Sequence, residues 1–516
     1  MAPLRHKANW LLAANAPGAT RFRRCLEHLP AGGRTVIDTD LERPPYPLVV
    51  QGGMGIGVSG WQLASAVGRA GGMGVVSGVA LDSIIARRLQ DGDDGGHLRW
   101  AFEHFPVPHV AASVLDRYFI PGGRRPGAPY RNVPRLTLNP SPDRERLSVV
   151  ATFAEIYLAK SASAGAPVGI NFLEKIQLST PSGAYGAMLA GVDAVLVGAG
   201  IPARLPALLD ALSRHEPVQF PIDVADAGSA RHALGFDPGA LLGPRLPEIR
   251  RPRFYAIVSS HTLAAYLAHH EQTRPDGFVV EGATAGGHNA PPRGNLNLDS
   301  NGEPIYGPRD VPDLSQLVTL GLPFWLAGGY SRPERVTLAR EYGACGVQVG
   351  TLFALAEESG LAVPLRRQLL AKLRSGKLEV RTEPLASPTG YPFKVAQLAG
   401  TLSEKCVAAE RRRVCDLSYL RIPYSEPGGA VGYRCPGEPV AAYVRKGGKR
   451  SETTDRVCLC NGLMATIGLG QKRPNGRIEA PVVTLGADTD GAREMLERHP
   501  EGWKAGDVVA YLTTPG

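Results

Sequence analysis

The chain of 516 residues lacks several features that mark particular classes of protein. It has no run of eighteen or more apolar residues, which argues against a helix that crosses a membrane. Its seven cysteines are an odd number in a long chain, which argues against a disulfide scaffold. The apolar piece within residues 1–17 is too short for the core of a signal peptide. These absences predict a reducing, cytoplasmic location.

The chain also lacks the patterning of a nucleic-acid-binding protein, although its formal net charge is +9. Two short basic clusters occur, at residues 411–413 and 446–450. Neither is interleaved with aromatic residues in the manner of an RNA-binding surface. We interpret both clusters as solvated surface, and we expect neither nucleic acid nor a membrane as a partner.

The sequence does have a regular alternation of short apolar runs with helical patterns. A strand of a parallel sheet is buried on both faces, so it is continuously apolar. Eight such units predict an α/β protein of the (β/α)8 or TIM-barrel class. The expected strands are residues 48–51, 74–77, 168–172, 194–197, 254–258, 278–281, 324–327 and 347–349, with residues 218–224 as a candidate for a further one.

The same alternation divides the chain into three parts. Residues 1–45 precede the first strand and form an N-terminal extension. Residues 46–375 form the barrel, with a proline- and glycine-rich insertion at about 91–143 and an irregular one at about 214–252. The alternation is lost after residue 375. We therefore expect residues 376–516 to form an appended, partly irregular region that contains cysteines and packs on the barrel.

A glycine-rich turn follows the sixth expected strand and ends in a histidine, His288. Glycine lets the backbone approach a flat or charged ligand, because it has no Cβ. Barrels keep their chemistry at the carboxyl ends of their strands. The segment 277–288 therefore predicts a stretch of backbone that lies against a cofactor, with a titratable side chain beside it. Taken alone, an ordinary structural turn explains it equally well.

Two further glycine-bearing turns follow the last two expected strands, at Gly328 and Gly329 and at Gly350 and Thr351. Backbone N–H groups at a helix amino terminus attract anions, and barrels often bind phosphate with these two loops. The turns predict a phosphate site, with ordinary turns as the alternative. Asn171 ends the third strand, where its amide could bond a heterocycle edge or simply serve the turn.

A competing pattern is a match to G-x-G-x-x-G at Gly55, Gly57 and Gly60. Asp82 follows at about the distance of a ribose-binding acid in a Rossmann domain. However, Asp82 begins a helical pattern of its own, where capping is the simpler explanation. The Rossmann hypothesis is therefore the weaker one.

Five cysteines lie within 55 residues of the C-terminal region. They contain no C-x-x-C pair, and the spacing Cys458-x-Cys460 is a poor substitute. We expect reduced, buried thiols and no metal, with zinc or iron–sulfur binding as the alternative. The five are Cys406, Cys415, Cys435, Cys458 and Cys460.

Taken in order, these segments resemble the nitronate monooxygenase family, formerly called 2-nitropropane dioxygenases, in its long bacterial form. The resemblance covers about residues 45–375, and the region from residue 387 onward also looks like the tail of longer members. It rests on the segments 51–55, 169–172, 281–288, 327–329 and 346–351.

The resemblance implies an FMN-bound barrel enzyme that oxidises a nitronate or nitroalkane with O2 as the acceptor. His288 matches the family's catalytic histidine, as a general base or as a cationic anchor. The chain departs from the family at Thr284, where many members have an acid, and in the long loop 289–311. The implied cofactor residues are Gly52, Gly53, Met54, Asn171, Glu281, Gly286, Gly287, Gly328, Gly329, Gly350 and Thr351.

Three other functions stay open from the sequence. An NAD(P)H-dependent FMN enoyl-thioester reductase is the first, because FMN-dependent enoyl-acyl carrier protein reductases look similar over the same barrel. A dehydrogenase of the inosine-monophosphate class is a weaker match, because Cys345 precedes the eighth strand instead of lying in a long loop. A flavin- or phosphate-binding regulatory protein is the third. The expected partners are a small-molecule substrate and O2, and a homo-oligomer stays open.

Overall fold

A computed structural model describes residues 46–163, 165–474 and 476–514 of the chain. The expected N-terminal extension, residues 1–45, and its apolar piece therefore lie outside the described residues. Residues 46–516 form one compact unit. Among the described helices, none is both long and apolar enough to cross a membrane.

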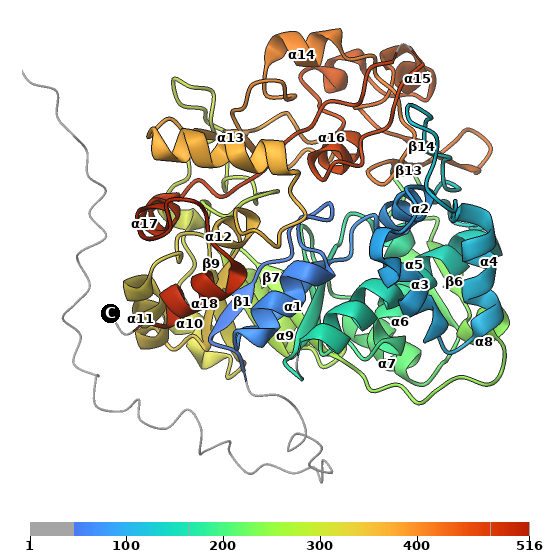
Figure 1. Cartoon of the computed structure of the whole chain (residues 1–516), viewed down its shortest axis with the longest axis horizontal. Helices are drawn as coiled ribbons and strands as arrows, with labels where there is room; N and C mark the ends of the chain where they lie inside the picture. Colours follow the sequence, from blue (N-terminus) through green and yellow to red (C-terminus); the bar gives the residue numbers. More distant parts are fainter. Residues whose placement is uncertain (1–45, 164, 475, 515–516) are drawn as a thin grey trace, which may run out of the picture. The chain divides into compact units, whose positions relative to one another are not determined.

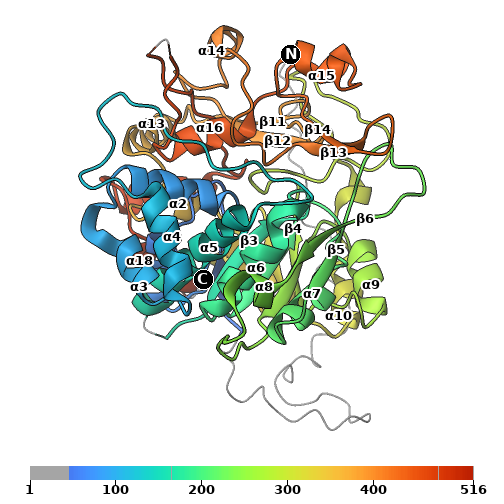
Figure 2. The ribbon, with the colours of Figure 1, turned by 90° about the vertical axis from the view of Figure 1, so that its right-hand side faces the viewer.

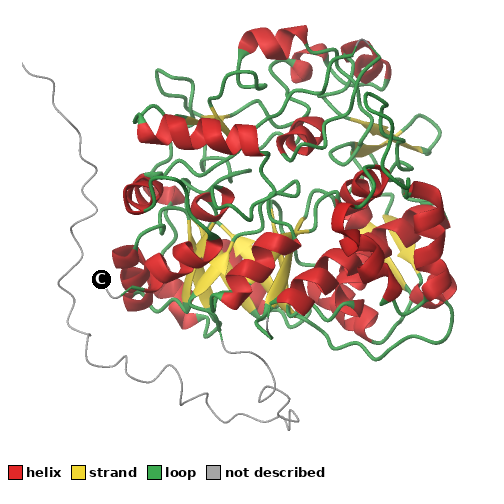
Figure 3. Ribbon diagram, in the orientation of Figure 1, coloured by secondary structure: helices red, strands yellow, loops and turns green. Residues whose placement is uncertain are grey.

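Eight parallel strands form the central sheet, which closes on itself (Figure 1, Figure 3). The edge strands meet where Gln51 N–H donates to the Met73 carbonyl at 2.9 Å and Met73 N–H donates to the Val49 carbonyl at 3.0 Å. The predicted (β/α)8 barrel is thus confirmed. Around the barrel the strands are β1 (Val49–Gln51), β2 (Gly74–Ser77), β3 (Val168–Leu173), β4 (Ala194–Gly198), β7 (Arg253–Val258), β8 (Gly277–Glu281), β9 (Phe324–Ala327) and β10 (Gly346–Val349).

The inside of the barrel is filled by side chains of its own strands. Val50, Leu196 and Val279 belong to a cluster around Trp325, which is fully buried. The Trp325 ring centroid lies 4.9 Å from that of Tyr255. Such a barrel is a packed core and not a pore. Room for a ligand is therefore expected at the carboxyl ends of the strands.

Helices surround the barrel, and the last described helix completes their ring. The helices assigned to the first seven strand–helix units are α1 (Trp61–Arg69), α5 (Pro142–Ala162), α6 (Thr180–Leu189), α7 (Leu205–Ser213), α9 (His261–His269), α10 (Leu314–Thr319) and α11 (Pro333–Glu341). Of these, α5 is not the first helix after its strand, because three shorter α-helices precede it. The place after β10 is taken by α18 (Ala505–Thr513), which packs on α1, α11 and β1 (Figure 1). The residues between β10 and α18 are therefore an insertion within the last strand–helix unit.

The two expected insertions contain regular structure. After α2 (Leu81–Gln90), the first contains η2 (Asp94–Gly96), α3 (His97–Glu103) and α4 (Pro108–Tyr118). The second was expected to be irregular, which is wrong: it holds the antiparallel pair β5 (Val218–Ile222) and β6 (His232–Phe236), then α8 (Pro238–Leu242). The candidate strand at 218–224 exists, but outside the barrel. Alternate residues of β5 are buried and exposed, whereas the barrel strands are buried almost throughout.

The C-terminal region lies over the carboxyl end of the barrel (Figure 2). It contains two antiparallel strand pairs, β11 (Val380–Glu383) with β12 (Phe393–Ala396) and β13 (Ile422–Ser425) with β14 (Val431–Arg434). The boundary expected near residue 375 stays a prediction. The remaining elements of the described residues are η3 (Gln177–Ser179), η4 (Pro308–Asp310), α12 (Thr351–Ala354), α13 (Val363–Arg374), α14 (Lys405–Glu410), α15 (Val440–Arg445), η5 (Arg450–Thr453), α16 (Leu459–Thr466) and α17 (Asp490–Arg498).

A buried ion pair connects this region to the barrel helices. Asp82, in the first turn of α2, pairs with Arg144 of α5, and both side chains are less than 5% exposed. The Tyr419 hydroxyl, from the C-terminal region, donates to the same carboxylate. The Asp82 that a Rossmann pattern would place on a ribose is thus a structural residue in a barrel, and the Rossmann hypothesis is wrong.

Replacing one partner of this pair should destabilise the whole chain. Arg144→Met leaves the Asp82 carboxylate buried without its cation, so we expect the free energy of unfolding to fall by about 3–5 kcal/mol. Arg117→Met is the control, because the Arg117–Asp143 pair is exposed on both sides and is worth at most about 1 kcal/mol. Urea unfolding followed by circular dichroism measures both variants. Equal losses in the two would contradict the assignment.

Candidate functional site

One cavity at the carboxyl end of the barrel brings together all the residues predicted for the site. Each barrel strand that was expected to contribute does so from its carboxyl end or from the loop that follows. The roles of these residues stay predictions, but their convergence is a property of the fold. The residues are Gly52, Gly53, Met54, Asn171, Glu281, Gly286, Gly287, His288, Gly328, Gly329, Gly350 and Thr351.

The first wall is the turn after β1, which hydrogen bonds hold in place. Gln51 Nε2 donates to Ser59 Oγ at 2.8 Å, and the same oxygen accepts from Met54 N–H at 2.9 Å. A Cβ at Gly53 would lie 2.3 Å from Cβ of Asn171, so only glycine fits there. The ends of β1 and β3 therefore meet closely, and Asn171 stands beside the glycine backbone.

The second wall is built by the loops after β8 and β9. Gly328 has φ +78°, and a Cβ there would lie 2.9 Å from the backbone nitrogen of Ala285. Only glycine combines this left-handed backbone with so close an approach. Glu281 lines the cavity between these loops, and burial raises the pKa of its carboxyl to about 7. Glu281 is therefore partly protonated near neutral pH.

A loop of the C-terminal region, residues 484–488, forms a third wall that the sequence did not reveal. Gly287 N–H donates to Thr484 Oγ1 at 2.9 Å, and Gly486 N–H donates to Thr351 Oγ1 at 3.0 Å. Ala487 N–H donates to the Thr284 carbonyl at 2.9 Å. The backbone carbonyl of Thr284 thus helps to attach this loop to the barrel.

His288 lines the cavity where the barrel meets the C-terminal region. Its Nε2 is 2.7 Å from Ser387 Oγ, and its ring meets Phe393 edge-on with centroids 4.9 Å apart. Burial lowers the pKa of His288 well below 6.5, and the nearby Lys175 ammonium lowers it further. His288 is therefore neutral at pH 7.

A row of polar side chains leads from His288 to Lys175. Ser387 Oγ is 2.8 Å from Thr389 Oγ1, and Lys175 Nζ donates to Thr389 Oγ1 at 3.2 Å. Lys175 Nζ also lies 3.1 Å from the Tyr391 ring centroid. Burial lowers the pKa of Lys175 to about 6, so this lysine is largely a neutral amine at pH 7. None of these four residues behind His288 was predicted for the site, because no motif links residue 175 with 387–391.

Two buried polar atoms in the cavity wall have no hydrogen-bond partner in the described chain. They are Ser331 Oγ, after β9, and Gln348 Oε1, on β10. A buried polar atom without a partner is costly, by about 1–3 kcal/mol. Both atoms therefore point to a polar ligand in the cavity.

Cys345 lies away from this cavity, which disfavours the inosine-monophosphate class of dehydrogenase. It directly precedes β10, and its N–H donates to the Phe324 carbonyl at the start of β9. The residue is therefore at the amino-terminal end of the barrel and packs against the interior cluster.

Comparison with known proteins agrees with the resemblance found in the sequence. Residues 245–391 match the family model described as nitronate monooxygenase. A (3aS,4S,5R,7aS)-5-hydroxy-7a-methyl-1-oxo-octahydro-1H-indene-4-carboxyl-CoA dehydrogenase of Mycobacterium tuberculosis is 28% identical over 254 residues. That match covers 44% of this chain and 64% of the relative, which is less than two thirds of its length.

Solved structures show more distant likenesses. FabK from Thermotoga maritima has a TM-score of 0.45 at 15% identity, over 91% of this chain and 92% of that one. A nitroalkane oxidase from Streptomyces ansochromogenes has a TM-score of 0.41 at 16% identity, over 91% and 95%. Likenesses this distant carry no information about a substrate.

Proposed function

We propose that this chain is a flavin-dependent oxidoreductase that binds FMN and oxidises a nitronate or nitroalkane, with O2 as the acceptor. The family match over residues 245–391 supports the reaction class. The observation that carries the proposal is His288, a histidine that burial keeps neutral in the wall of a glycine-lined cavity. A neutral imidazole is suited to take a proton from a carbon acid.

The fit of FMN can be tested at the two ends of the cavity. At one end, Gly52 and Gly53 offer backbone without side chains to a flat ring, and Asn171 with Gln348 offers polar groups to its edge. The partnerless Gln348 Oε1 would gain a hydrogen bond from such a ring. This end fits the isoalloxazine.

At the other end, Gly328, Gly329 and Gly350 offer backbone to a phosphate, and Ser331 offers a hydroxyl without a partner. Oriented backbone N–H groups bind anions without a positive side chain. The Asp488 carboxylate also lines the cavity, and it disfavours phosphate because two negative charges repel each other. With that exception, the residues fit FMN.

Bound FMN would take electrons from the substrate and pass them to O2. The chain itself would position the substrate and move the proton. When Nε2–H of His288 donates to Ser387, the lone pair on Nδ1 can accept a proton from the carbon next to a nitro group. The lowered pKa of His288 favours this role of base over that of a cationic anchor.

The polar row behind His288 gives the Nε2 proton a path. Ser387 and Thr389 each hold a hydroxyl that can accept one proton and release another. Lys175, with its pKa lowered to about 6, is a neutral amine at the far end and can accept the proton. The resulting ammonium would lie over the Tyr391 ring, where a cation is stabilised.

A second function is favoured by a specific observation. The Mycobacterium tuberculosis relative is named as a dehydrogenase of a carboxyl-CoA, and a thioester acidifies its neighbouring carbon as a nitro group does. NAD(P)H-dependent reduction of an enoyl thioester, by the same FMN and the same cavity, is therefore the alternative.

Anaerobic bleaching of the purified protein separates the two. We expect a nitronate alone to remove the flavin colour rapidly. Bleaching only by NADPH or NADH would replace the proposal with the enoyl-thioester reductase. A protein that neither contains flavin nor takes up added FMN would overturn both functions.

Removing the base should affect neutral and ionised substrates differently. In His288→Ala, turnover of a neutral nitroalkane should fall roughly 10²–10⁴-fold, because its proton has lost its acceptor. Turnover of the preformed nitronate should fall much less, and FMN should stay bound. His109→Ala, at an exposed position of α4, is the control. Equal losses with both substrates would contradict the role of base.

Lys175→Met should move the pH dependence of the reaction. The rate falls as pH falls through the pKa of His288, which burial and then Lys175 lower. The rate also falls through the pKa of Lys175, about 6, because its neutral amine receives the proton. Lys175→Met should therefore lower the rate at pH 7 and remove this step from the acidic limb of kcat/KM. Lys377→Met, on the surface, should leave the limb unchanged. A lower rate with an unmoved limb would assign Lys175 a purely structural role.

A further inference from the structure

The cavity in the barrel has an apolar wall, formed by side chains that the fit of FMN does not use. Segments at the ends of β1, β2 and β3 supply four of these side chains, and the C-terminal region supplies the other four. All eight belong to one hydrophobic cluster or pack against it. We call this set the apolar wall: Ile56, Val79, Leu173, Ile176, Phe393, Leu420, Leu459 and Leu463.

The apolar wall lies away from the end of the cavity that fits a phosphate. In the closed order of strands, β3 stands opposite β9, and β2 stands opposite β8. The glycines that fit a phosphate follow β9 and β10, whereas Val79 and Ile176 follow β2 and β3. A Cβ at Gly55, in the turn after β1, would lie 3.6 Å from Cβ of Val79. The apolar wall is therefore on the side that fits the isoalloxazine.

No side chain that lines the cavity carries a positive charge at pH 7. Among the described residues, no lysine or arginine lines it, and its carboxyl groups are those of Glu281 and Asp488. His288 is neutral, because burial lowers its pKa well below 6.5. Burial also raises the pKa of the Cys460 thiol well above its usual value, so this thiol stays protonated. A negative group far from the reacting carbon would find no cation here.

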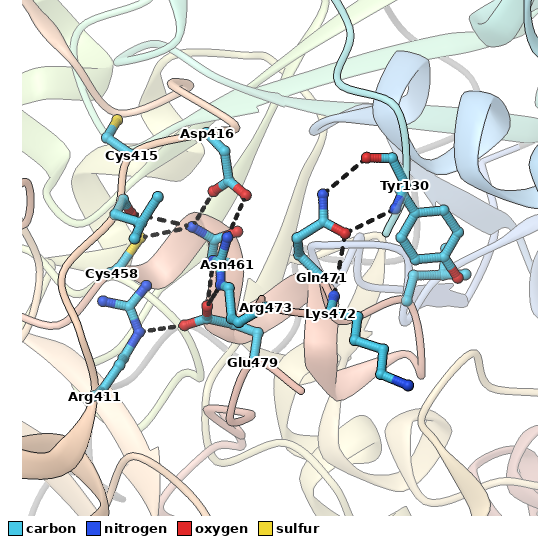
Figure 4. A network of polar contacts seen from close by, with 12 residues as sticks. Tyr130, Arg411, Cys415, Asp416, Cys458, Asn461, Gln471, Lys472, Arg473 and Glu479 are labelled. Carbon is cyan, nitrogen blue, oxygen red and sulfur yellow. Dashed lines mark hydrogen bonds and ion pairs between the residues drawn. The ribbon is translucent and has the colours of Figure 1, made fainter. Parts of the chain in front are cut away.

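Polar contacts behind the cavity hold the C-terminal part of the apolar wall in place (Figure 4). Asn461 lies on α16 between Leu459 and Leu463. Its Nδ2 donates to Asp416 Oδ1 at 2.6 Å, and Arg473 donates to the other oxygen of that carboxylate at 2.8 Å. These contacts attach α16 to the loop before β13. The apolar surface is therefore formed before any ligand binds.

We propose that the apolar wall binds an uncharged alkyl chain of the substrate, and that Leu420, Leu459 and Leu463 set the preference for its length. This rests on the proposed function and names its substrate class, a nitroalkane whose nitro group is its one polar group. Removal of such a chain from water into an apolar cavity is favourable in proportion to the area buried.

The charges of the proposed reaction limit the substrate in the same way. When His288 takes the proton, one negative charge forms on the nitronate and one positive charge forms in the row that leads to Lys175. The two charges balance each other. A carboxylate at the far end of the chain would be a second, buried charge without a partner, which is strongly unfavourable.

Steady-state kinetics of the full chain with straight nitroalkanes of two to six carbons tests the proposal. Each added CH2 should raise kcat/KM about fourfold, until the chain fills the space along the apolar wall. A nitroalkane of the same length that ends in a carboxylate should react more than about 100-fold more slowly than its uncharged counterpart. A series that is flat or falls with length, or equal rates with the carboxylate, would overturn the proposal.

A variant of the apolar wall then tests its part in the preference. In Leu463→Ala, the ratio of kcat/KM for the six-carbon to the two-carbon nitroalkane should fall about tenfold, because the long chain loses apolar surface. Leu212→Ala removes an equally large, buried side chain on α7, outside the cavity, and should leave the ratio unchanged. Equal ratios in the two variants would contradict the assignment. If Leu463→Ala does not fold, the series with the unaltered chain still decides.

Equilibrium binding separates a failure of this inference from a failure of the proposed function. The same nitroalkanes are titrated without oxygen, followed by flavin absorbance or, if the protein holds no flavin, by calorimetry. Affinity that rises with chain length without any turnover would overturn the proposed function and leave the alkyl-binding wall in place. Affinity that does not rise with chain length would overturn the inference, whether or not turnover occurs.

Discussion

The contact between residues 484–487 and the turn before His288 is the constraint on which the site depends. A Cβ at Gly286 would lie 2.9 Å from the backbone carbon of Leu485, so the two backbones touch with no side chain between them. Two hydrogen bonds, donated by Gly287 N–H and Ala487 N–H, hold the two segments in a fixed alignment. The barrel alone would therefore present an open rim, and the cavity exists only because another part of the chain closes it.

That same part of the chain sets the chemistry of the proposed base. His288 comes from the barrel, but Ser387 and Phe393, which contact its ring, come from the C-terminal region. Burial is the first cause of the lowered pKa of His288, so the covering region controls whether this histidine carries a charge. Residues outside the barrel thus decide between a base and an anion anchor, two roles that the sequence left equally open.

The sequence predicted the parts of the site that local rules determine. Continuous apolar runs located the eight barrel strands, and glycines after them located the walls, because close backbone approach requires glycine in the motif itself. It missed Lys175 and Thr389, which lie behind His288, and the cavity loop 484–488. Contacts between residues 135 to 214 positions apart bring these segments together, and they carry no local signature. It gave β5 as a candidate strand but did not separate it from the barrel strands, although the alternating burial of β5 is typical of a strand with one exposed face.

The topology explains why so much chain outside the barrel reaches the site. Strand β10 ends at the carboxyl rim, and the helix that completes its unit, α18, packs on α1, α11 and β1. The start of α18 lies close to the end of β10, because Ala505 N–H donates to the Glu358 carboxylate. Any residues inserted between them must leave from that rim and return to it. A longer insertion costs little in stability, because each doubling of its length raises the entropic cost of closing the loop by about 0.6 kcal/mol. An insertion at this point therefore covers the cavity at the carboxyl ends of the strands.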